Sequence, residues 1–179
     1  MLMNECLFLD GLTSVTGVCV TKNEDIVVSD SSIKPKVKIY RSDGKVLSKL
    51  EGPFKHPYQV TSNTKTDHIY VVDPRLHCIM KFEGMGRYRG SFGADNLIWP
   101  CSACVDNCGN LLVCDRADRK IKMFSEEGAF IGKVLGREDG LVSPIGVCVD
   151  TVCKSGRLAI IEEELRTGGE DRVYLKVFK

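Results

Sequence analysis

The 179-residue sequence lacks long hydrophobic runs and an excess of charge of either sign, and it has only three histidines and one tryptophan. Its apolar stretches extend over a few residues, whereas a helix that crosses a bilayer needs about 20. Residues 1–10 lack the basic and hydrophobic regions of a signal peptide. The 25 Lys and Arg residues against 24 Asp and Glu residues give a formal net charge of +1. The whole molecule therefore has no strong attraction for nucleic acid or an anionic membrane, and recognition through charge must be local.

Motifs of the common enzymes are also absent. The sequence holds no Gly-x-Ser-x-Gly, P-loop, His-Glu-x-x-His or dinucleotide-binding motif, and no RING-like run of Cys and His. We therefore expect no catalytic residue, no bound metal and no cofactor. A metal-dependent lyase or hydrolase is the alternative, but it would need a convergence of His56 and His77, expected in loops, with His68, expected beside a strand.

Cysteine is the one chemically reactive residue type that is abundant in the sequence. The odd total of nine, the absence of an Asn-x-Ser/Thr site and the lack of an export signal favour a reducing compartment, the cytoplasm. Cys101, Cys104 and Cys108 have the short spacing that zinc-binding thiolates can have. Cys104, however, shares its position in the repeat described next with Cys19 and Cys148, which favours a core position in a strand over a metal ligand.

One pattern occurs four times along the chain. Its first segment starts at residues 15, 57, 100 and 144, at spacings of 42, 43 and 44, and reads Val-Thr-Gly-Val-Cys-Val, Pro-Tyr-Gln-Val-Thr-Ser, Pro-Cys-Ser-Ala-Cys-Val and Pro-Ile-Gly-Val-Cys-Val. A second β-rich segment ends in an acidic residue in each copy: Asp30, Asp73, Asp115 and Glu162. A third segment covers residues 37–40, 79–82, 121–124 and 175–178. In the first three copies a glycine that allows a tight turn follows it, and then a fourth β-rich segment.

Each unit therefore predicts four short strands, which is typical of a β-propeller blade. We expect an all-β fold with a single propeller domain over residues 1–179, and blades at about 15–52, 57–94, 100–137 and 144–179. Residues 10–15 match residues 139–144, so residues 5–14 are expected to supply the strand that closes the last blade. Two arrangements fit this pattern: a small four-bladed ring, or a fragment of a six-bladed ring with unprotected edges.

The succession of Pro/Val-x-Gly-Val-x-Val, Val-Val-x-Asp and Ile-x-x-Phe-x-x-x-Gly is similar to the NHL repeat over nearly the whole chain. Residues 100–124 carry the pattern most fully, whereas Gln59 replaces the usual glycine in the second copy and the fourth copy contains an insertion. The resemblance implies a propeller like the C-terminal NHL domain of tripartite-motif proteins. It also implies a non-catalytic module that selects protein targets for ubiquitylation or binds RNA to repress translation. Any ubiquitin ligase activity would need a RING domain, which this chain does not contain.

The acidic residues that end the second segment have two interpretations. Asp30, Asp73 and Asp115 could converge on a central channel and hold a cation. The favoured interpretation is structural, because an Asp at a strand end accepts hydrogen bonds from the backbone of the following loop, once in each blade.

Basic residues concentrate in the loops that follow the second strand and in the connections between blades, which emerge on one face of a propeller. Phe54, Tyr58 and Trp99 lie in or beside the same connections and could stack on bases. We expect a partner-binding face that contacts a protein target or single-stranded RNA, but neither a membrane nor a small-molecule cofactor. Its candidate residues are Lys34, Lys36, Lys55, His56, Arg75, His77, Trp99, Arg116, Arg119 and Lys120. Loop charges that only face water are the alternative, which the near-zero net charge supports.

Overall fold

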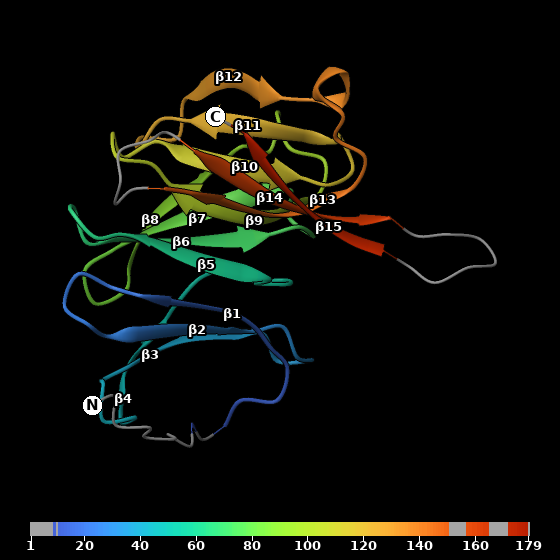
Figure 1. Ribbon diagram of the computed structural model, residues 1–179. Coiled ribbons are helices and arrows are strands. Elements are labelled where there is room, and N and C mark those ends of the chain that lie inside the picture. Colours follow the sequence, from blue (N-terminus) through green and yellow to red (C-terminus); the bar gives the residue numbers. More distant parts are fainter. Residues whose placement is uncertain (1–8, 10, 151–156, 165–171, 179) are drawn as a thin grey trace, which may run out of the picture.

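The computed structural model describes residues 9, 11–150, 157–164 and 172–178, which form four antiparallel sheets (Figure 1). The first three sheets have four strands each and the fourth has three described strands. The first sheet comprises β1 (Val15–Val20), β2 (Ile26–Asp30), β3 (Lys36–Tyr40) and β4 (Val46–Leu50), and the second comprises β5 (Gln59–Asn63), β6 (His68–Asp73), β7 (Cys78–Glu83) and β8 (Arg87–Phe92). The third comprises β9 (Pro100–Val105), β10 (Leu111–Asp115), β11 (Lys120–Phe124) and β12 (Phe130–Leu135), and the fourth comprises β13 (Pro144–Val149), β14 (Leu158–Glu164) and β15 (Arg172–Phe178). A short 3₁₀ turn at Arg137–Asp139 precedes the fourth sheet.

Each sheet is one repeat of the sequence, and its strands pair in chain order. This confirms the all-β propeller fold and the four-stranded blade as its unit. The strand expected from residues 5–14 cannot be placed, because residues 5–8 and 10 lie outside the described residues. Most of the insertion in the fourth blade, residues 165–171, also lies outside them. No helix of the described residues is long and apolar enough to cross a membrane.

The blades pack face to face in chain order. At each junction the first strand of the following blade packs on the first two strands of the preceding blade: β5 on β1 and β2, β9 on β5 and β6, and β13 on β9 and β10. Within the described residues no packing of this kind joins β13 to β1, so these four blades do not form a closed ring. We call the side of a blade that meets the next blade its forward face and the opposite side its rear face.

Alternate residues of the central strands point to opposite faces of the blade and pack against different neighbouring blades. These strands are therefore apolar at almost every position. In β6, Ile69 and Val71 belong to the hydrophobic cluster shared with the first blade, whereas Tyr70 and Val72 belong to the cluster shared with the third. The same alternation in β10 contributes Leu111 and Val113 to the rear cluster and Leu112 and Cys114 to the forward cluster. The second and third blades therefore each stabilise both of their neighbours by burying apolar surface.

The cysteines in the repeat position of Cys104 occupy strand positions, as expected. Cys19 and Cys104 are half-buried and pack against hydrophobic clusters, and burial raises the pKa of each thiol to about 12. Such thiols stay protonated at neutral pH and are poor nucleophiles. Cys148, at the same position of the fourth blade, is exposed because no described strand packs on that face. Among the described residues no group of three His, Cys, Asp or Glu side chains is arranged to hold a metal ion.

Candidate functional site: the loop face

The face of interest is built from two kinds of segment. The first kind is the loop after the second strand of each blade, residues 31–35, 74–77 and 116–119, and the second is the connection into each blade, residues 51–58, 93–99 and 136–143. In the third blade a backbone hydrogen bond joins the two kinds, from the amide of Arg116 to the carbonyl of Trp99, and in the second blade the amide of Tyr58 in the connection donates to the carbonyl of Val72 in β6. We call this surface the loop face.

A buried carboxylate at the end of each second strand fixes the loops in place. Asp30, Asp73 and Asp115 are buried, and each accepts two backbone N–H groups from the connection that enters its blade and at least one from the loop that follows it. In the fourth blade Glu162 accepts the N–H groups of Val142 and Ser143. The structural interpretation of these residues is thus confirmed. Their carboxylates accept hydrogen bonds from the connection between blades as well as from the following loop.

The electrostatics of Asp30 follow from this geometry. Burial alone would raise its pKa, but the N–H groups of Thr13 and Ser32 and the ammonium of Lys36, whose Nζ lies 3.3 Å from Oδ2, hold the pKa well below its usual range. Asp30 is therefore a fixed anion at neutral pH.

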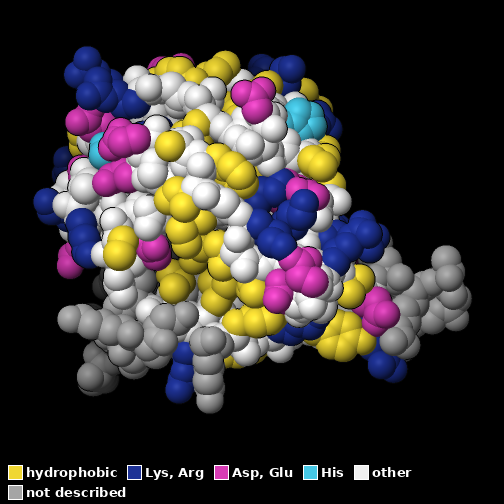
Figure 2. All heavy atoms as spheres, turned by 90° about the horizontal axis from the view of Figure 1, so that it is seen from above, with side chains coloured by type: hydrophobic (Ala, Val, Ile, Leu, Met, Phe, Trp, Pro, Cys, Tyr) yellow, Lys and Arg dark blue, Asp and Glu magenta, His cyan; other side chains and the backbone are white. Residues whose placement is uncertain are grey.

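Three of the candidate basic residues are paired within the molecule. Lys36 binds Asp30, Lys120 binds Asp118 at 3.0 Å, and Arg116 binds Glu163 at 2.7 Å. These pairs reduce the positive charge that the sequence predicts for the loop face. Figure 2 shows Lys and Arg side chains next to Asp and Glu side chains, with hydrophobic groups between them, and no continuous basic surface on the side it presents.

Four other candidates, Lys34, Lys55, Arg75 and Arg119, are exposed and have no ion-pair partner within the described part of the chain. His56 stacks on Tyr58, with ring centroids 5.7 Å apart and an interplanar angle of 29°. Nδ1 of His77 lies 2.5 Å from the carbonyl oxygen of Ile98, so this side chain braces the neighbouring connection.

Two candidates adopt the left-handed backbone conformation that favours glycine. His77 and Arg119 occupy the same position in successive loops, with φ of 54° and 57°. A side chain costs roughly 1–2 kcal/mol there relative to the right-handed region. This strain makes the two positions worth testing for a role in binding.

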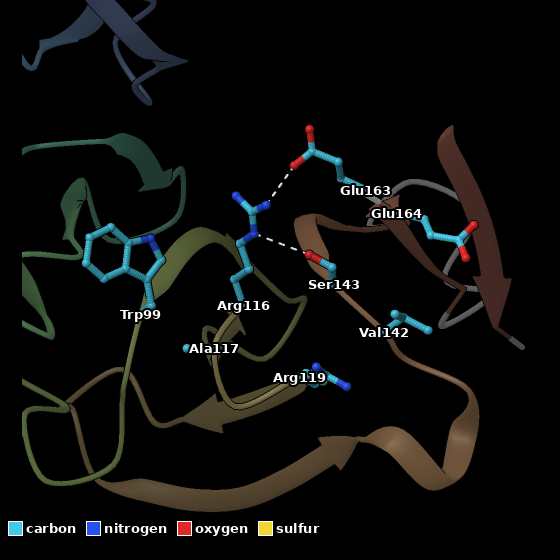
Figure 3. A pocket seen from close by; sticks show the side chains of 8 residues that line it. All are labelled: Trp99, Arg116, Ala117, Arg119, Val142, Ser143, Glu163 and Glu164. Atoms are coloured by element: carbon cyan, nitrogen blue, oxygen red, sulfur yellow. Dashed lines mark hydrogen bonds and ion pairs between the residues drawn. The ribbon is translucent and has the colours of Figure 1, made fainter. Parts of the chain in front are cut away.

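A cleft of about 570 Å³ lies on the loop face between the third and fourth blades (Figure 3). Its lining joins an indole, two guanidinium groups, a hydroxyl and two carboxylates: Trp99, Arg116, Ala117, Arg119, Val142, Ser143, Glu163 and Glu164. Arg116 lies between Trp99 and Glu163, and its Nε donates to Ser143 Oγ at 3.2 Å. The cleft thus offers an aromatic wall and charges of both signs.

Three of the ten candidates, Trp99, Arg116 and Arg119, line this cleft, and the others lie outside its lining. Sequence reasoning missed Val142, Ser143 and Glu164 as lining residues and the partnership of Arg116 with Glu163. The sequence does show an acidic run at residues 162–164. No local pattern, however, relates Glu163 to Arg116, which lies 47 positions earlier in the chain.

Comparison with known proteins gives one match in sequence. No family model matches the chain. The protein Brain tumor of Drosophila melanogaster, an NHL-repeat protein, is 31% identical over 139 residues, which cover 74% of this chain and 13% of that protein. The chain resembles NHL-repeat propellers in sequence and in fold. It spans only a small part of its relative's length, so the activity and partners of the whole relative do not transfer with this match.

Solved structures match this chain at the level of the fold. Virginiamycin B lyase from Staphylococcus aureus superposes with a TM-score of 0.70 at 15% identity, covering 94% of this chain and 58% of that chain. A chain of the nidogen/laminin complex gives 0.68 at 20% identity, covering 89% and 64%, and a putative gluconolactonase gives 0.69 at 15% identity, covering 86% and 58%. Because two of these are named as enzymes and one as a binding complex, the shared fold does not select a function.

Proposed function

We propose that this NHL-type propeller is a non-catalytic recognition module that binds a protein target through the loop face. The observation that carries the proposal is the cleft of Trp99, Arg116, Arg119, Glu163 and Glu164, which combines a half-exposed indole with charges of both signs. Trp and Arg are the residues that most often anchor protein interfaces. Paired charges at the rim of an interface orient the partner and make its recognition specific, and they contribute less to the affinity.

Exposed apolar side chains on the loop face point to the same class of partner. Ile98, Tyr58 and Val142 are all exposed beside the loop-face charges. A polypeptide with apolar and charged side chains would complement such a mixed surface, whereas a phosphate backbone would meet the carboxylates of Glu163 and Glu164. The proposal includes two further parts. Participation in target selection for ubiquitylation, as in tripartite-motif ligases, rests on the resemblance alone, and location in the cytoplasm rests on the cysteine content of the sequence.

Single-stranded RNA is the second candidate partner, and one observation favours it. Lys34, Lys55, Arg75 and Arg119, which have no ion-pair partner among the described residues, occur in successive loops and connections of the first three blades, with Tyr58 and Trp99 between them along the chain. Unpaired cations interleaved with aromatic rings bind phosphates and stack on bases. Binding of this kind weakens steeply as salt concentration rises, because each neutralised phosphate releases counterions.

A peptide selection tests the proposal. A displayed library of random peptides is selected on the wild-type chain, and the recovered peptides are titrated against a Trp99→Ala, Arg119→Glu double variant and a matched Arg87→Glu, Tyr88→Ala control on β8. Protein recognition by the loop face predicts that the double variant loses at least tenfold in affinity while the control keeps it. Peptides that bind all three forms equally would contradict the proposal.

The RNA candidate is tested with a pool of random single-stranded RNA at two salt concentrations. Substituting Lys55, Arg75 and Arg119 by Glu should abolish salt-sensitive binding, whereas substituting Lys22, Arg41 and Arg87 should not. RNA binding that survives the loop-face triple variant, or that is equally lost in the control, would exclude this face as an RNA site.

A further inference from the structure

Two buried thiols on neighbouring strands of the third blade are in direct contact. Cys101 of β9 and Cys114 of β10 are 5% and 0% exposed, and their Sγ atoms lie 3.6 Å apart. Both are free thiols in the structure. A disulfide joins two sulfur atoms at about 2 Å, so the contact needs only a short further approach of the two side chains to become a covalent bond.

An interruption in the pairing of β9 with β10 produces this contact. Pro100 pairs with Asp115 and Ser102 pairs with Cys114, so Cys101 is the extra residue of a β-bulge. A bulge changes the local direction of side chains. As a result, Cys101 belongs to the same forward hydrophobic cluster as Cys114.

The repeat brings the equivalent side chains together in the first blade as well. There the two positions hold Thr16 and Ser29, whose hydroxyl oxygens lie 3.4 Å apart beside an irregularity at the same place in the strand pairing. The backbone of the blade therefore sets the contact, and the third blade is the one that places two thiols in it. The second and fourth blades hold Tyr58 with Val72 and Ile145 with Ile161.

The pair lies next to the loop-face cleft. One residue separates Cys101 from Trp99 and one separates Cys114 from Arg116, and both Trp99 and Arg116 line the cleft. Across the junction with the fourth blade, Cys101 Sγ lies 3.5 Å from the carbonyl oxygen of Pro144. A small oxidant that enters the cleft therefore has a short path to the two sulfur atoms.

The two thiols differ in their surroundings. The hydrogen bond from Cys101 and burial raise the pKa of Cys114 well above its usual value. Cys114 therefore stays protonated at neutral pH and is a poor nucleophile for an oxidant. Cys101 is the slightly more exposed of the two, so it is the thiol that an oxidant meets first.

We propose that Cys101 and Cys114 form a reversible disulfide when the protein meets hydrogen peroxide. The thiolate of Cys101 attacks one peroxide oxygen, the O–O bond breaks, and a sulfenic acid and water form with the proton that Cys101 gave up. The sulfur of Cys114 then attacks the sulfur of Cys101. The S–S bond forms, the S–O bond breaks, and hydroxide leaves as water with the proton of Cys114.

This reaction is balanced by the peroxide alone. The two thiols lose two electrons, and hydrogen peroxide is reduced to two molecules of water. A reversible, redox-sensing disulfide is the kind that a reducing compartment permits. The proposal concerns the chemistry of the third blade and does not rest on partner binding by the loop face.

The experiment treats the full chain, reduced and then freed of reductant, with hydrogen peroxide under native conditions. The chain is next denatured and alkylated, and its mass gives the number of thiols that remain. The wild type is expected to lose two alkylatable thiols, and dithiothreitol should restore both. Chymotrypsin cleaves after Leu112 and so separates Cys101 from Cys114, which allows the linked peptides to be identified by mass spectrometry.

Variants that borrow the residues of the first blade assign the bond. Cys101→Thr and Cys114→Ser should each fail to form it, whereas Cys104→Ser, which removes a half-buried thiol of the same strand, is the matched control and should still form it. Circular dichroism confirms that each variant is folded. A disulfide between Cys104 and Cys148 in place of this one would overturn the proposal. So would a native wild-type chain in which Cys101 and Cys114 both remain alkylatable after peroxide treatment.

Discussion

At the scale of the residue, the two equivalent glycines test how closely the blades pack. Gly17→Ala is expected to destabilise the protein by about 1–3 kcal/mol, since its Cβ would overlap the backbone of β5. Gly146→Ala is expected to leave the stability of the protein unchanged or to raise it by up to about 1 kcal/mol, because it removes chain entropy without a clash. Urea unfolding of both variants measures the difference, and equal losses would contradict the close approach at Gly17.

The carboxylate of Asp30 gives a second residue-scale prediction, on pH dependence. Its pKa is lowered in the folded protein, so its contribution to stability is complete above the unfolded-state value of about 4. That contribution is lost as pH falls below about 4 toward the folded-state pKa. Asp30→Asn should therefore be less stable than the wild type at pH 7, with a gap that narrows below about pH 4.

Thermal unfolding of Asp30→Asn and of the exposed Asp95→Asn across this pH range provides the measurement. The control should track the wild type at every pH. A stability gap for Asp30→Asn that stays constant from neutral to acid pH would show that the charge of Asp30 contributes nothing to holding the loops.

The strained residues of the loop face yield a third prediction. Arg119→Gly removes the steric penalty of a side chain at φ 57° and should keep or slightly raise stability, whereas Arg119→Val, with a branched Cβ, should lower it by about 1–2 kcal/mol. Both variants lose the guanidinium, so both should lose partner affinity. If only the less stable variant lost affinity, the backbone rather than the side chain would be the determinant of binding.

At the scale of the element, the central strands depend on apolar side chains on both faces. Val71 in β6 is fully buried opposite Met80 in β7, within an apolar cluster. Val71→Asp would bury a charge without a partner and should destabilise the protein by more than about 3 kcal/mol, enough to unfold it. Val46→Asp in the edge strand β4 places the same charge in water and should remain folded by circular dichroism.

Prediction from sequence works best at this scale. The four first-segment motifs begin at the observed first residues of β1, β9 and β13 and two residues before β5. The acidic strand ends at Asp30, Asp73 and Asp115 have their expected role, because a local pattern of turn and strand residues encodes both features. The fourth blade is less regular, since its insertion separates β14 from β15.

At the scale of the whole molecule, the arrangement of charges on the loop face could not be predicted from the sequence. The pairing of Arg116 with Glu163 depends on how two blades pack and on where the insertion begins, so counting basic residues in loops overestimates the positive charge. Close packing at Gly17 is likewise a property of a blade junction. A repeat pattern indicates which residues occupy equivalent positions in each blade, but it does not show which blades pack against each other.

The central claim, recognition through the loop face, is tested most directly by the affinity of a selected peptide for the Trp99→Ala, Arg119→Glu double variant. Fluorescence anisotropy against the wild type and the Arg87→Glu, Tyr88→Ala control gives the comparison at one salt concentration. The account predicts at least a tenfold loss for the double variant and unchanged affinity for the control, with all three proteins folded. Equal affinity for the wild type and the double variant would contradict it.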